Sequence, residues 1–320
     1  MEQNRYRRTM IIVNSIQELK EVLRPDEGCA VAIGKFDGMH LGHRALLDEV
    51  IRKKEEGLTA AVVTFDPSPE VYFGFNTDGE LLTRSEKRIA LAQIGTDILF
   101  ELPFNRETAA TEPSEFVRTV LCGGLHARFI AAGSDLSFGN KGSGNFELLE
   151  ALSPEYGYTA RLVDKIAYKD RPISSTRIRS YIKQGRMEDA ASCLGSPYSF
   201  TGDVVHGKAL GRTIDIPTAN IDPEEGKLLP PFGVYYSNIL IDRRVFHGMT
   251  NIGRKPTVKD NNVVNLETYL YDCHEDLYGQ KITVQLLHYR RPEHRFSDIE
   301  QLKETMEQDV LAGRDFFKEQ

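Results

Sequence analysis

Gly34-Lys35-Phe36-Asp37-Gly38-Met39-His40-Leu41-Gly42-His43 follows an apolar run at residues 29–33 and leads into a helical pattern that begins near Leu41. A strand, a glycine-containing turn and a helix start, in this order, predict a phosphate-binding cradle. The N–H groups at a helix N-terminus lack intrahelical partners and carry partial positive charge, so an anion there is stabilised. His40 and His43 would add side-chain donors. The stretch alone fits equally well a tight turn whose histidines only cap the helix.

Strand-like and helix-like patterns alternate from residue 29 to about residue 194. Strands are predicted at residues 29–33, 58–65, 97–102, 128–132 and 161–163. Between them, Gly57 is placed to end one helix, and Thr83 with Glu86 has capping-box spacing at the start of another. This alternation predicts an α/β domain with a doubly wound parallel sheet, Rossmann-like, over residues 1–194. Ligands of such sheets bind at the carboxyl ends of the strands, where the decapeptide lies.

The pattern changes at Gly195-Ser196-Pro197, after which short alternating strands dominate. They are predicted at residues 198–205, 233–241, 245–252, 263–271 and 282–288. Few helical periods intervene, so we expect an antiparallel β-barrel domain over residues 195–320. A final helix is expected to start at Ser297, with Glu300 completing a capping box, and to end at Gly313.

Composition limits the classes of protein to which the chain can belong. A net charge of −7 over 320 residues argues against a general nucleic-acid binder, which needs a clustered basic surface. The four cysteines are scattered without CxxC spacing, so reduced thiols are expected rather than a zinc site or a disulfide framework. No long apolar segment follows the N-terminal arginines. We therefore expect a cytoplasmic protein with no membrane partner; its oligomeric state is left open.

A second phosphate-binding pattern is Ile173-Ser174-Ser175-Thr176-Arg177-Ile178-Arg179. Three hydroxyls and two guanidiniums at a predicted helix start suit phosphate oxygens, although a serine-capped surface helix would also explain them. Together with the decapeptide, this segment resembles the HxGH and ISSTxIR signatures of the nucleotidyltransferase superfamily.

Further segments resemble the bacterial bifunctional riboflavin kinase/FMN adenylyltransferase family, also called FAD synthetase, from about Gly34 to Phe296. They are Thr64-Phe65-Asp66-Pro67, Leu82-Thr83 with Glu86-Lys87, and Gly133 with Phe138-Gly139. The resemblance implies that the first domain transfers AMP from ATP to FMN, giving FAD and pyrophosphate. The FMN phosphate is already largely ionised at pH 7, because its second pKa is about 6, so this reaction needs no general base.

The resemblance assigns roles in the first domain. His40 and His43 would donate to the α-phosphate, and Arg179 would act with the hydroxyls that hold the pyrophosphate. Asp37 and Asp66 are candidates for organising substrate or Mg²⁺, although Asp66 also fits an ordinary Asp-Pro turn. The implied nucleotide-binding residues are Gly34, Phe36, Asp37, Gly38, Gly42, Asp66, Ser174, Ser175 and Thr176. The implied flavin-binding residues are Gly133 and Asp135.

The segment from His206 to Asn220 resembles the riboflavin kinase loop that ends in Pro-Thr-Ala-Asn; a flexible hairpin connection is the plainer alternative. The resemblance implies an ATP site made by Gly207, Lys208, Gly211, Arg212, Thr218, Asn220 and Tyr235. Tyr235 would also fit the core. Thr218 and Asn220 would supply oxygen ligands to Mg²⁺, which prefers a few hard oxygen donors.

The kinase reaction needs a base, because the primary ribityl hydroxyl of riboflavin is protonated at neutral pH. Glu267 on a predicted strand matches the catalytic glutamate of the family; by spacing alone it would be an outward-facing strand residue. The implied flavin-binding residues of this domain are Asn251, Gly253, Thr257, Arg291, Glu293 and Phe296.

Three places depart from the usual family pattern. Ser68 stands where the family usually has histidine, Leu136-Ser137 where it has an aromatic and a basic residue, and Asp215-Ile216 where it has Gly-Phe. The first two would weaken FMN binding for adenylylation, and Asp215 would place a negative charge near a polyphosphate. Two alternatives to a bifunctional enzyme follow: one retained activity, with the kinase favoured, or a flavin sensor without turnover.

Overall fold

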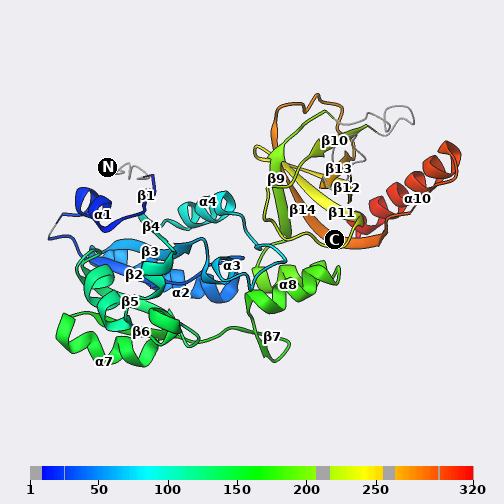
Figure 1. Cartoon of the computed structure of the whole chain (residues 1–320). Helices are drawn as coiled ribbons and strands as arrows, with labels where there is room; N and C mark the ends of the chain where they lie inside the picture. The colour runs from blue at the N-terminus through cyan, green and yellow to red at the C-terminus, as the bar shows by residue number, and fades with distance from the viewer. Residues whose placement is uncertain (1–8, 25, 207–216, 255–263, 295, 320) are drawn as a thin grey trace, which may run out of the picture. The chain divides into compact units, whose positions relative to one another are not determined.

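A computed structural model describes residues 9–24, 26–206, 217–254, 264–294 and 296–319. The chain divides into two compact units, residues 1–175 and 176–320 (Figure 1). Within the described residues, no helix combines the length and the apolar composition needed to cross a membrane.

The first unit is built on a parallel sheet with the strand order β1-β4-β3-β2-β5-β6, which confirms the predicted α/β class. Its strands are β1 (Ile11–Val13), β2 (Cys29–Ile33), β3 (Thr59–Asp66), β4 (Ile98–Pro103), β5 (Ala127–Gly133) and β6 (Thr159–Val163). Its helices are α1 (Ile16–Val22), α2 (Leu41–Arg52), α3 (Pro69–Tyr72), α4 (Arg84–Ile94), α5 (Arg106–Ala109), α6 (Pro113–Phe116) and α7 (Phe146–Tyr156). A small hairpin follows, formed by β7 (Ala167–Tyr168) and β8 (Arg171–Pro172).

Both faces of the central strands β2, β3, β4 and β5 are largely buried, as their uninterrupted apolar runs predict. Alternate residues of β2 belong to separate cores: Val31 packs with α1 and α7, whereas Ala32 packs with α2 and α4. The chain leaves β2 toward β3 on one side and later returns to pair β5 on its other side. The decapeptide therefore follows the strand at which the order reverses, where open α/β sheets bind ligands.

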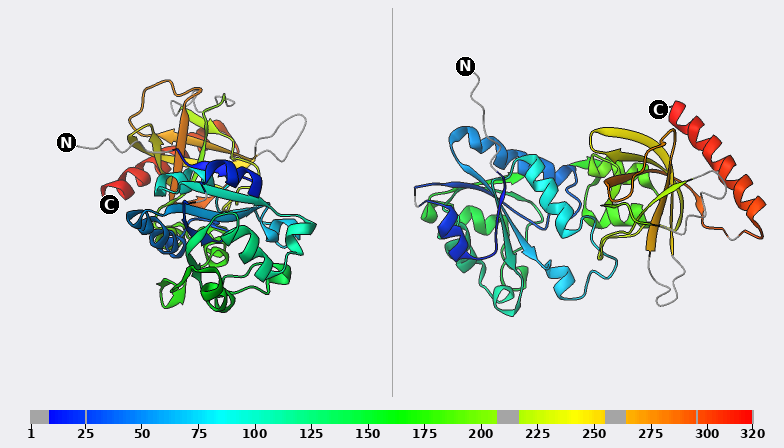
Figure 2. Two further views of the ribbon diagram at one scale, coloured as in Figure 1. Left: turned by 90° about the vertical axis from the view of Figure 1, so that its left-hand side faces the viewer. Right: turned by 90° about the horizontal axis from the view of Figure 1, so that it is seen from above.

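The second unit begins with α8 (Ser175–Lys183), whose first residue closes the first unit, and α9 (Met187–Leu194). Its sheet is antiparallel, in the order β10-β13-β12-β11-β14-β9. The strands are β9 (Tyr198–Asp203), β10 (Thr218–Ile221), β11 (Gly233–Ile241), β12 (Arg244–Arg254), β13 (Val264–Leu270) and β14 (Lys281–Pro292). A bridge between Val205 and Asn220 joins the two edges, so the sheet curls into the expected barrel-like form (Figure 2).

The last helix, α10 (Ile299–Lys318), differs from the prediction at both ends. Asp298 rather than Ser297 is the N-cap, because its side chain accepts a hydrogen bond from the Gln301 N–H. Gly313 does not end the helix. It is a point of close approach, since a Cβ at Gly313 would lie 2.1 Å from the hydroxyl oxygen of Tyr271.

Candidate active sites

The cradle after β2 is held in shape by its backbone and by a buried ring. Gly38 has φ +87°, and Phe36 and Met39 have φ +51° and +44°, values that non-glycine residues adopt only when packing compensates the strain. The Phe36 side chain is fully buried in the core. It therefore anchors the loop, and the structure gives its side chain no place as a nucleotide contact.

Two hydrogen bonds connect the cradle to distant segments. The Asp37 carboxylate accepts from the Leu81 and Leu82 N–H groups at 2.8 and 3.2 Å, which fixes the approach to α4. The Ser175 hydroxyl donates to the Asp37 carbonyl oxygen at 2.8 Å. The structure thus brings Ser175 to the cradle, although the two are far apart in the sequence.

The two histidines form a stacked pair. His40 is the N-cap of α2, and its Nδ1 accepts from the His43 N–H at 3.2 Å. The rings stack with centroids 3.6 Å apart, and a Cβ at Gly42 would lie 3.2 Å from the His40 ring. The proposed capping role is therefore real for His40. Because Nδ1 of His40 accepts this hydrogen bond, the neutral ring carries its proton on Nε2.

Burial keeps both rings neutral. It lowers the pKa of His40 to about 4, against a smaller opposing effect of the negative charge of Asp135. It lowers the pKa of His43 well below its usual value, and the neighbouring His40 and Lys87 charges act in the same direction. Nδ1 of His43 has no hydrogen-bond partner among the described residues. At pH 7 the pair can donate N–H groups to a phosphate without adding positive charge.

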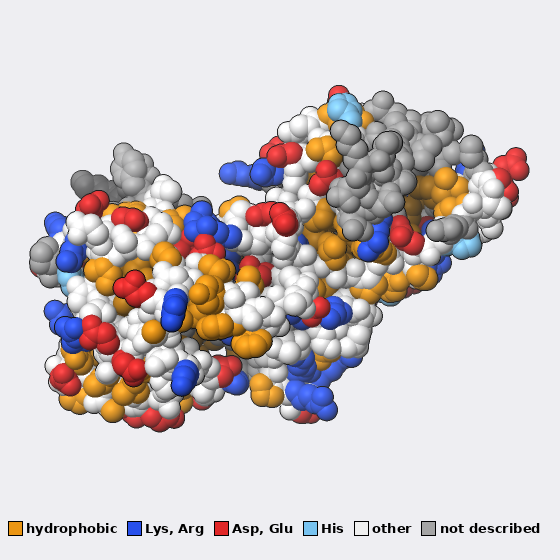
Figure 3. All heavy atoms as spheres, in the orientation of Figure 1, with side chains coloured by type: hydrophobic (Ala, Val, Ile, Leu, Met, Phe, Trp, Pro, Cys, Tyr) orange, Lys and Arg blue, Asp and Glu red, His pale blue; other side chains and the backbone are white. Residues whose placement is uncertain are grey.

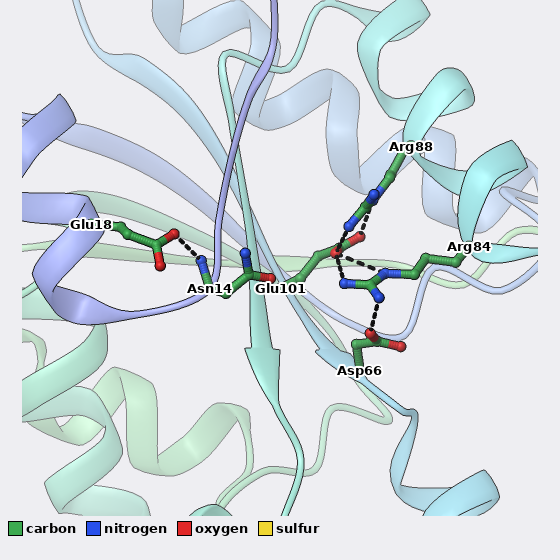
Figure 4. A network of polar contacts seen from close by, with 6 residues as sticks. All are labelled: Asn14, Glu18, Asp66, Arg84, Arg88 and Glu101. Carbon is green, nitrogen blue, oxygen red and sulfur yellow. Dashed lines mark hydrogen bonds and ion pairs between the residues drawn. The ribbon is translucent and has the colours of Figure 1, made fainter.

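A cavity of about 50 Å³ lies at the ends of β3 and β4 and is lined by Asp66, Ser68, Lys87 and Glu101, among others. Asp66 pairs with the Arg84 guanidinium at 2.7 Å (Figure 4). Ser68 is the N-cap of α3 and accepts from the Val71 N–H at 3.4 Å. The position at which the family usually has histidine is therefore used here to start a helix.

Two charged residues of this cavity were given no role from the sequence, although Lys87 belongs to a segment that resembles the family. Lys87 is 7% exposed, and no hydrogen bond or ion pair joins its ammonium group to another described residue. Glu101 is 2% exposed; burial raises its pKa, but hydrogen bonds from Arg88 and Arg84 outweigh this and hold the pKa below its usual value (Figure 4). The only signal for Glu101 was an acidic residue inside an otherwise apolar strand.

The residues assigned to flavin in the first unit lie at the end of β5 and directly after it: Gly133 is the last residue of the strand, and Asp135 follows. Asp135 is exposed, forms an ion pair with Lys165 at 3.2 Å and acts on the pKa of His40, so it lies near the cradle. Leu136 packs against the apolar core, whereas Ser137 is exposed. Leu136, one of the residues that depart from the family pattern, thus packs against the core.

The second unit places several predicted residues in one row across its sheet. In the register of the strands, Asn220 on β10 pairs with Glu267 on β13, and Glu267 pairs with Asn251 on β12. The row continues through Val234 on β11 to Arg291 on β14. Because directly paired residues point to the same face, these side chains share one surface of the sheet.

That surface and α10 enclose a cavity of about 160 Å³. Leu302 and Met306 of α10 contribute to its wall. The predicted residues that line it are Thr218, Asn251, Glu267, Arg291, Glu293 and Phe296. Gly253 borders this group, since a Cβ there would lie 1.9 Å from a Glu293 carboxylate oxygen.

The proposed Mg²⁺ ligands fit the ion in chemistry. Thr218 and Asn220 are two residues apart on β10, so they lie on the same face, beside Glu267. Asn220 is 4% exposed, and its Oδ1 accepts from the Asn265 Nδ2 at 3.1 Å, which fixes the orientation of its amide. An oxygen donor set with few protein ligands suits Mg²⁺. Asn265 was missed in the sequence.

The remaining predicted residues of the kinase site either lie in the core or fall outside the described residues. Tyr235 is fully buried, its hydroxyl donates to the Pro231 carbonyl oxygen, and it points to the face opposite Val234, into the barrel. This corrects its assignment to the nucleotide site; the tyrosine belongs to the core. The predictions that lie outside the described residues are those for Gly207, Lys208, Gly211, Arg212, Asp215, Ile216 and Thr257.

Comparisons with known proteins match two parts of the chain to two family models. The FAD synthetase family model matches residues 23–177, and the riboflavin kinase model matches residues 194–317. The bifunctional riboflavin kinase/FMN adenylyltransferase of Haemophilus influenzae is 34% identical over 96% of this chain and 99% of its own length. That of Escherichia coli K12 is 36% identical over 96% of this chain and 98% of its own length. The chain belongs to this bifunctional family.

A solved structure has the same fold over nearly the whole chain. It is described as a macrolide-efflux protein from Streptococcus pneumoniae, is 28% identical, covers 96% of this chain and 99% of its own, and has a TM-score of 0.83. Within the family assignment, the histidine cradle falls in the FAD synthetase match, and the cavity with Glu267 falls in the riboflavin kinase match.

Proposed function

We propose that this chain is a bifunctional enzyme that phosphorylates riboflavin to FMN and then adenylylates FMN to FAD. The observation that supports the proposal is the presence of two separate groups of candidate residues, the histidine cradle and the cavity with Glu267, each inside a region that matches one of the two family models. The two reactions make different chemical demands, and the two sites differ accordingly.

In adenylylation, an oxygen of the FMN phosphate attacks the α-phosphorus of ATP. The new P–O bond joins AMP to FMN, and the bond to the β-phosphate breaks to release pyrophosphate. The nucleophile arrives ionised, so alignment and charge neutralisation are the main requirements. His40 and His43 donate N–H groups to the α-phosphate, and the buried Lys87 ammonium offsets repulsion between the two phosphates. Ser174 and Ser175, with Thr176 and Arg179 on α8, hold the pyrophosphate.

In the kinase reaction, Glu267 accepts the proton of the primary ribityl hydroxyl as its oxygen attacks the γ-phosphorus of ATP. The bond between the β- and γ-phosphates breaks, and ADP leaves. Thr218 and Asn220 would hold Mg²⁺, which neutralises phosphate charge. A second cavity, of about 460 Å³, also includes Thr218 in its wall. ATP bound there would direct its terminal phosphate toward the flavin cavity.

We also propose residues 1–194 and 195–320 as the two functional domains, and the cytoplasm as the place of action. The four cysteines are free thiols, as a reducing compartment maintains. Acidic and basic side chains are interspersed over the visible face of the first unit, which argues against a nucleic-acid partner (Figure 3). The substrates are small molecules, namely flavins and ATP.

A single time course tests the proposal. The protein is incubated with riboflavin, ATP and Mg²⁺, and FMN is separated from FAD. We expect FMN first and FAD later. FMN without FAD would contradict the bifunctional proposal, and tight flavin binding without any product would favour a sensor.

Two variants of the same chain test the division of labour. Glu267→Gln should abolish FMN formation and leave FAD formation from added FMN intact. His43→Ala should do the reverse. Each variant carries its own control, because the other activity reports that the protein is folded. Equal loss of both activities in either variant would refute the assignment.

A further inference from the structure

A carboxylate lies buried in the apolar face of α10. Leu302, Met306, Val310 and Phe317 recur on this face at helical spacing and pack on or near the sheet. Asp309 lies on the same face and is only 2% exposed. An apolar residue would dock the helix at lower cost, because burying an ionised carboxylate is unfavourable unless it is paired.

Asp309 is paired with the last strand of the barrel. Nε of Arg291 donates to Oδ2 of Asp309 at 2.8 Å, and Nη2 lies 2.7 Å from the same oxygen. Nε of Arg290 lies 3.5 Å from Oδ1. Nη1 of Arg291 donates to the Pro292 carbonyl oxygen at 3.2 Å. The guanidinium plane of Arg291 is therefore fixed from two sides.

Arg291 lies at the opposite end of the cavity row from Glu267. Three strand spacings separate β13 from β14 in the sheet order, which corresponds to about 14 Å. This distance suits a flavin whose ribityl hydroxyl is at Glu267 and whose ring system extends toward Arg291. The ring is uncharged and carries carbonyl oxygens, which accept hydrogen bonds from a guanidinium. Asp309 compensates the charge of Arg291, so this end of the cavity offers donors without excess positive charge.

We propose that Asp309 is a positioning residue for riboflavin: it orients Arg291 so that N–H groups not used by Asp309 or Pro292 bind the carbonyl edge of the ring. This inference rests on the proposed kinase function. It makes the docking of α10 part of flavin recognition, since the helix supplies both the apolar wall of Leu302 and Met306 and the carboxylate that aims Arg291.

Asp309→Asn tests the proposal in the full chain, because it keeps the shape of the side chain and removes its charge. We expect KM for riboflavin to rise about tenfold, with kcat changed less than twofold and KM for ATP unchanged. Riboflavin binding, measured by quenching of its fluorescence, should weaken by the same factor. Asp315→Asn, at an exposed carboxylate on the same helix, is the matched control and should leave both values unchanged.

A double-variant cycle separates positioning from a structural role. Arg291→Met should also weaken riboflavin binding, and adding Asp309→Asn to it should cause no further loss, because Asp309 acts through Arg291. Asp309→Glu should restore part of the affinity. Additive losses, or a lower melting temperature of Asp309→Asn with unchanged riboflavin binding, would overturn the proposal. If Asp309→Asn does not fold, Arg291→Lys takes its place in the test. Lysine keeps the positive charge but lacks the planar guanidinium group that Asp309 orients. An unchanged KM for riboflavin in this variant would equally overturn the proposal.

Failure of the proposed function would be recognised separately. A wild-type protein that binds riboflavin but makes no FMN would refute the kinase assignment, whereas the binding measurements on the variants would still support or refute the role of Asp309.

Discussion

The neutral histidine pair makes the stability of the first unit depend on pH. Burial lowers the pKa of His40 to about 4, whereas the unfolded chain titrates near 6.5. Between these values the unfolded state binds a proton that the folded state excludes, so stability falls as the pH drops from 7 toward 4 and stays constant below that value. At pH 5 the loss from this one group is about 2 kcal/mol.

The perturbation that isolates His40 is His40→Asn. Asparagine is a good N-cap residue, so its side chain can still accept from the His43 N–H, and it does not titrate in this range. The assay is urea or thermal unfolding of both proteins at pH 7, 6 and 5. In a unit of this size, a loss of about 2 kcal/mol lowers the melting temperature by about 4 to 8 °C. We expect the wild type to lose this much more than the variant between pH 7 and pH 5.

Other groups also titrate between pH 7 and pH 5, so the difference between the two proteins is the informative quantity. His126→Asn in the same unit is the control for loss of a histidine, and its positive φ of 48° suits asparagine. Parallel losses of stability in the wild type and His40→Asn would refute the reasoning, since they would show that His40 is not protonated more readily in the unfolded state.

Three further predictions concern positions with a defined environment. Lys87→Met should slow FAD formation at least tenfold with FMN formation unchanged, and should raise the pKa of His43, seen by NMR, because a neighbouring positive charge is removed. Gly313→Ala should destabilise the second unit by about 1 to 3 kcal/mol in denaturant unfolding, since its methyl group would meet the Tyr271 hydroxyl; Tyr271→Phe should restore part of this loss. Ser68→His should lower KM for FMN in FAD formation, and an unchanged value would show that this departure is neutral.

The sequence predicted the parallel sheet well, because its strands are continuous apolar runs separated by capped helices. It missed β1 and β10, which have three and four residues and therefore carry too little periodicity. It also took Gly313 for a helix end. Glycine usually has that meaning after a helical pattern, and only the buried Tyr271 hydroxyl shows that this glycine serves close packing.

The candidate sites were predictable where a motif is continuous in sequence and not where charges meet across the fold. The cradle and the row around Glu267 came from short motifs. Glu101 shows only as an acidic residue inside an apolar strand, and Asp309 looks like an ordinary surface residue. The arginine partners of Glu101 are 13 and 17 residues away, and those of Asp309 are 18 and 19 residues away. Asn265 meets Asn220 across 45 residues. A charged residue that is buried in the fold can be identified from the sequence only when the residue that pairs with it is known.

The departures from the family pattern in the first unit preserve its framework while changing the surface of the cavity. Ser68 caps α3 through its hydroxyl, and Leu136 packs against the core. A histidine could cap a helix as well, since His40 does so through Nδ1 in this chain. The family residue at position 68 would therefore satisfy the same helix start and also present a ring to the cavity. Serine at this position keeps the cap and lacks the ring, so we expect it to weaken FMN binding and to leave the fold unchanged.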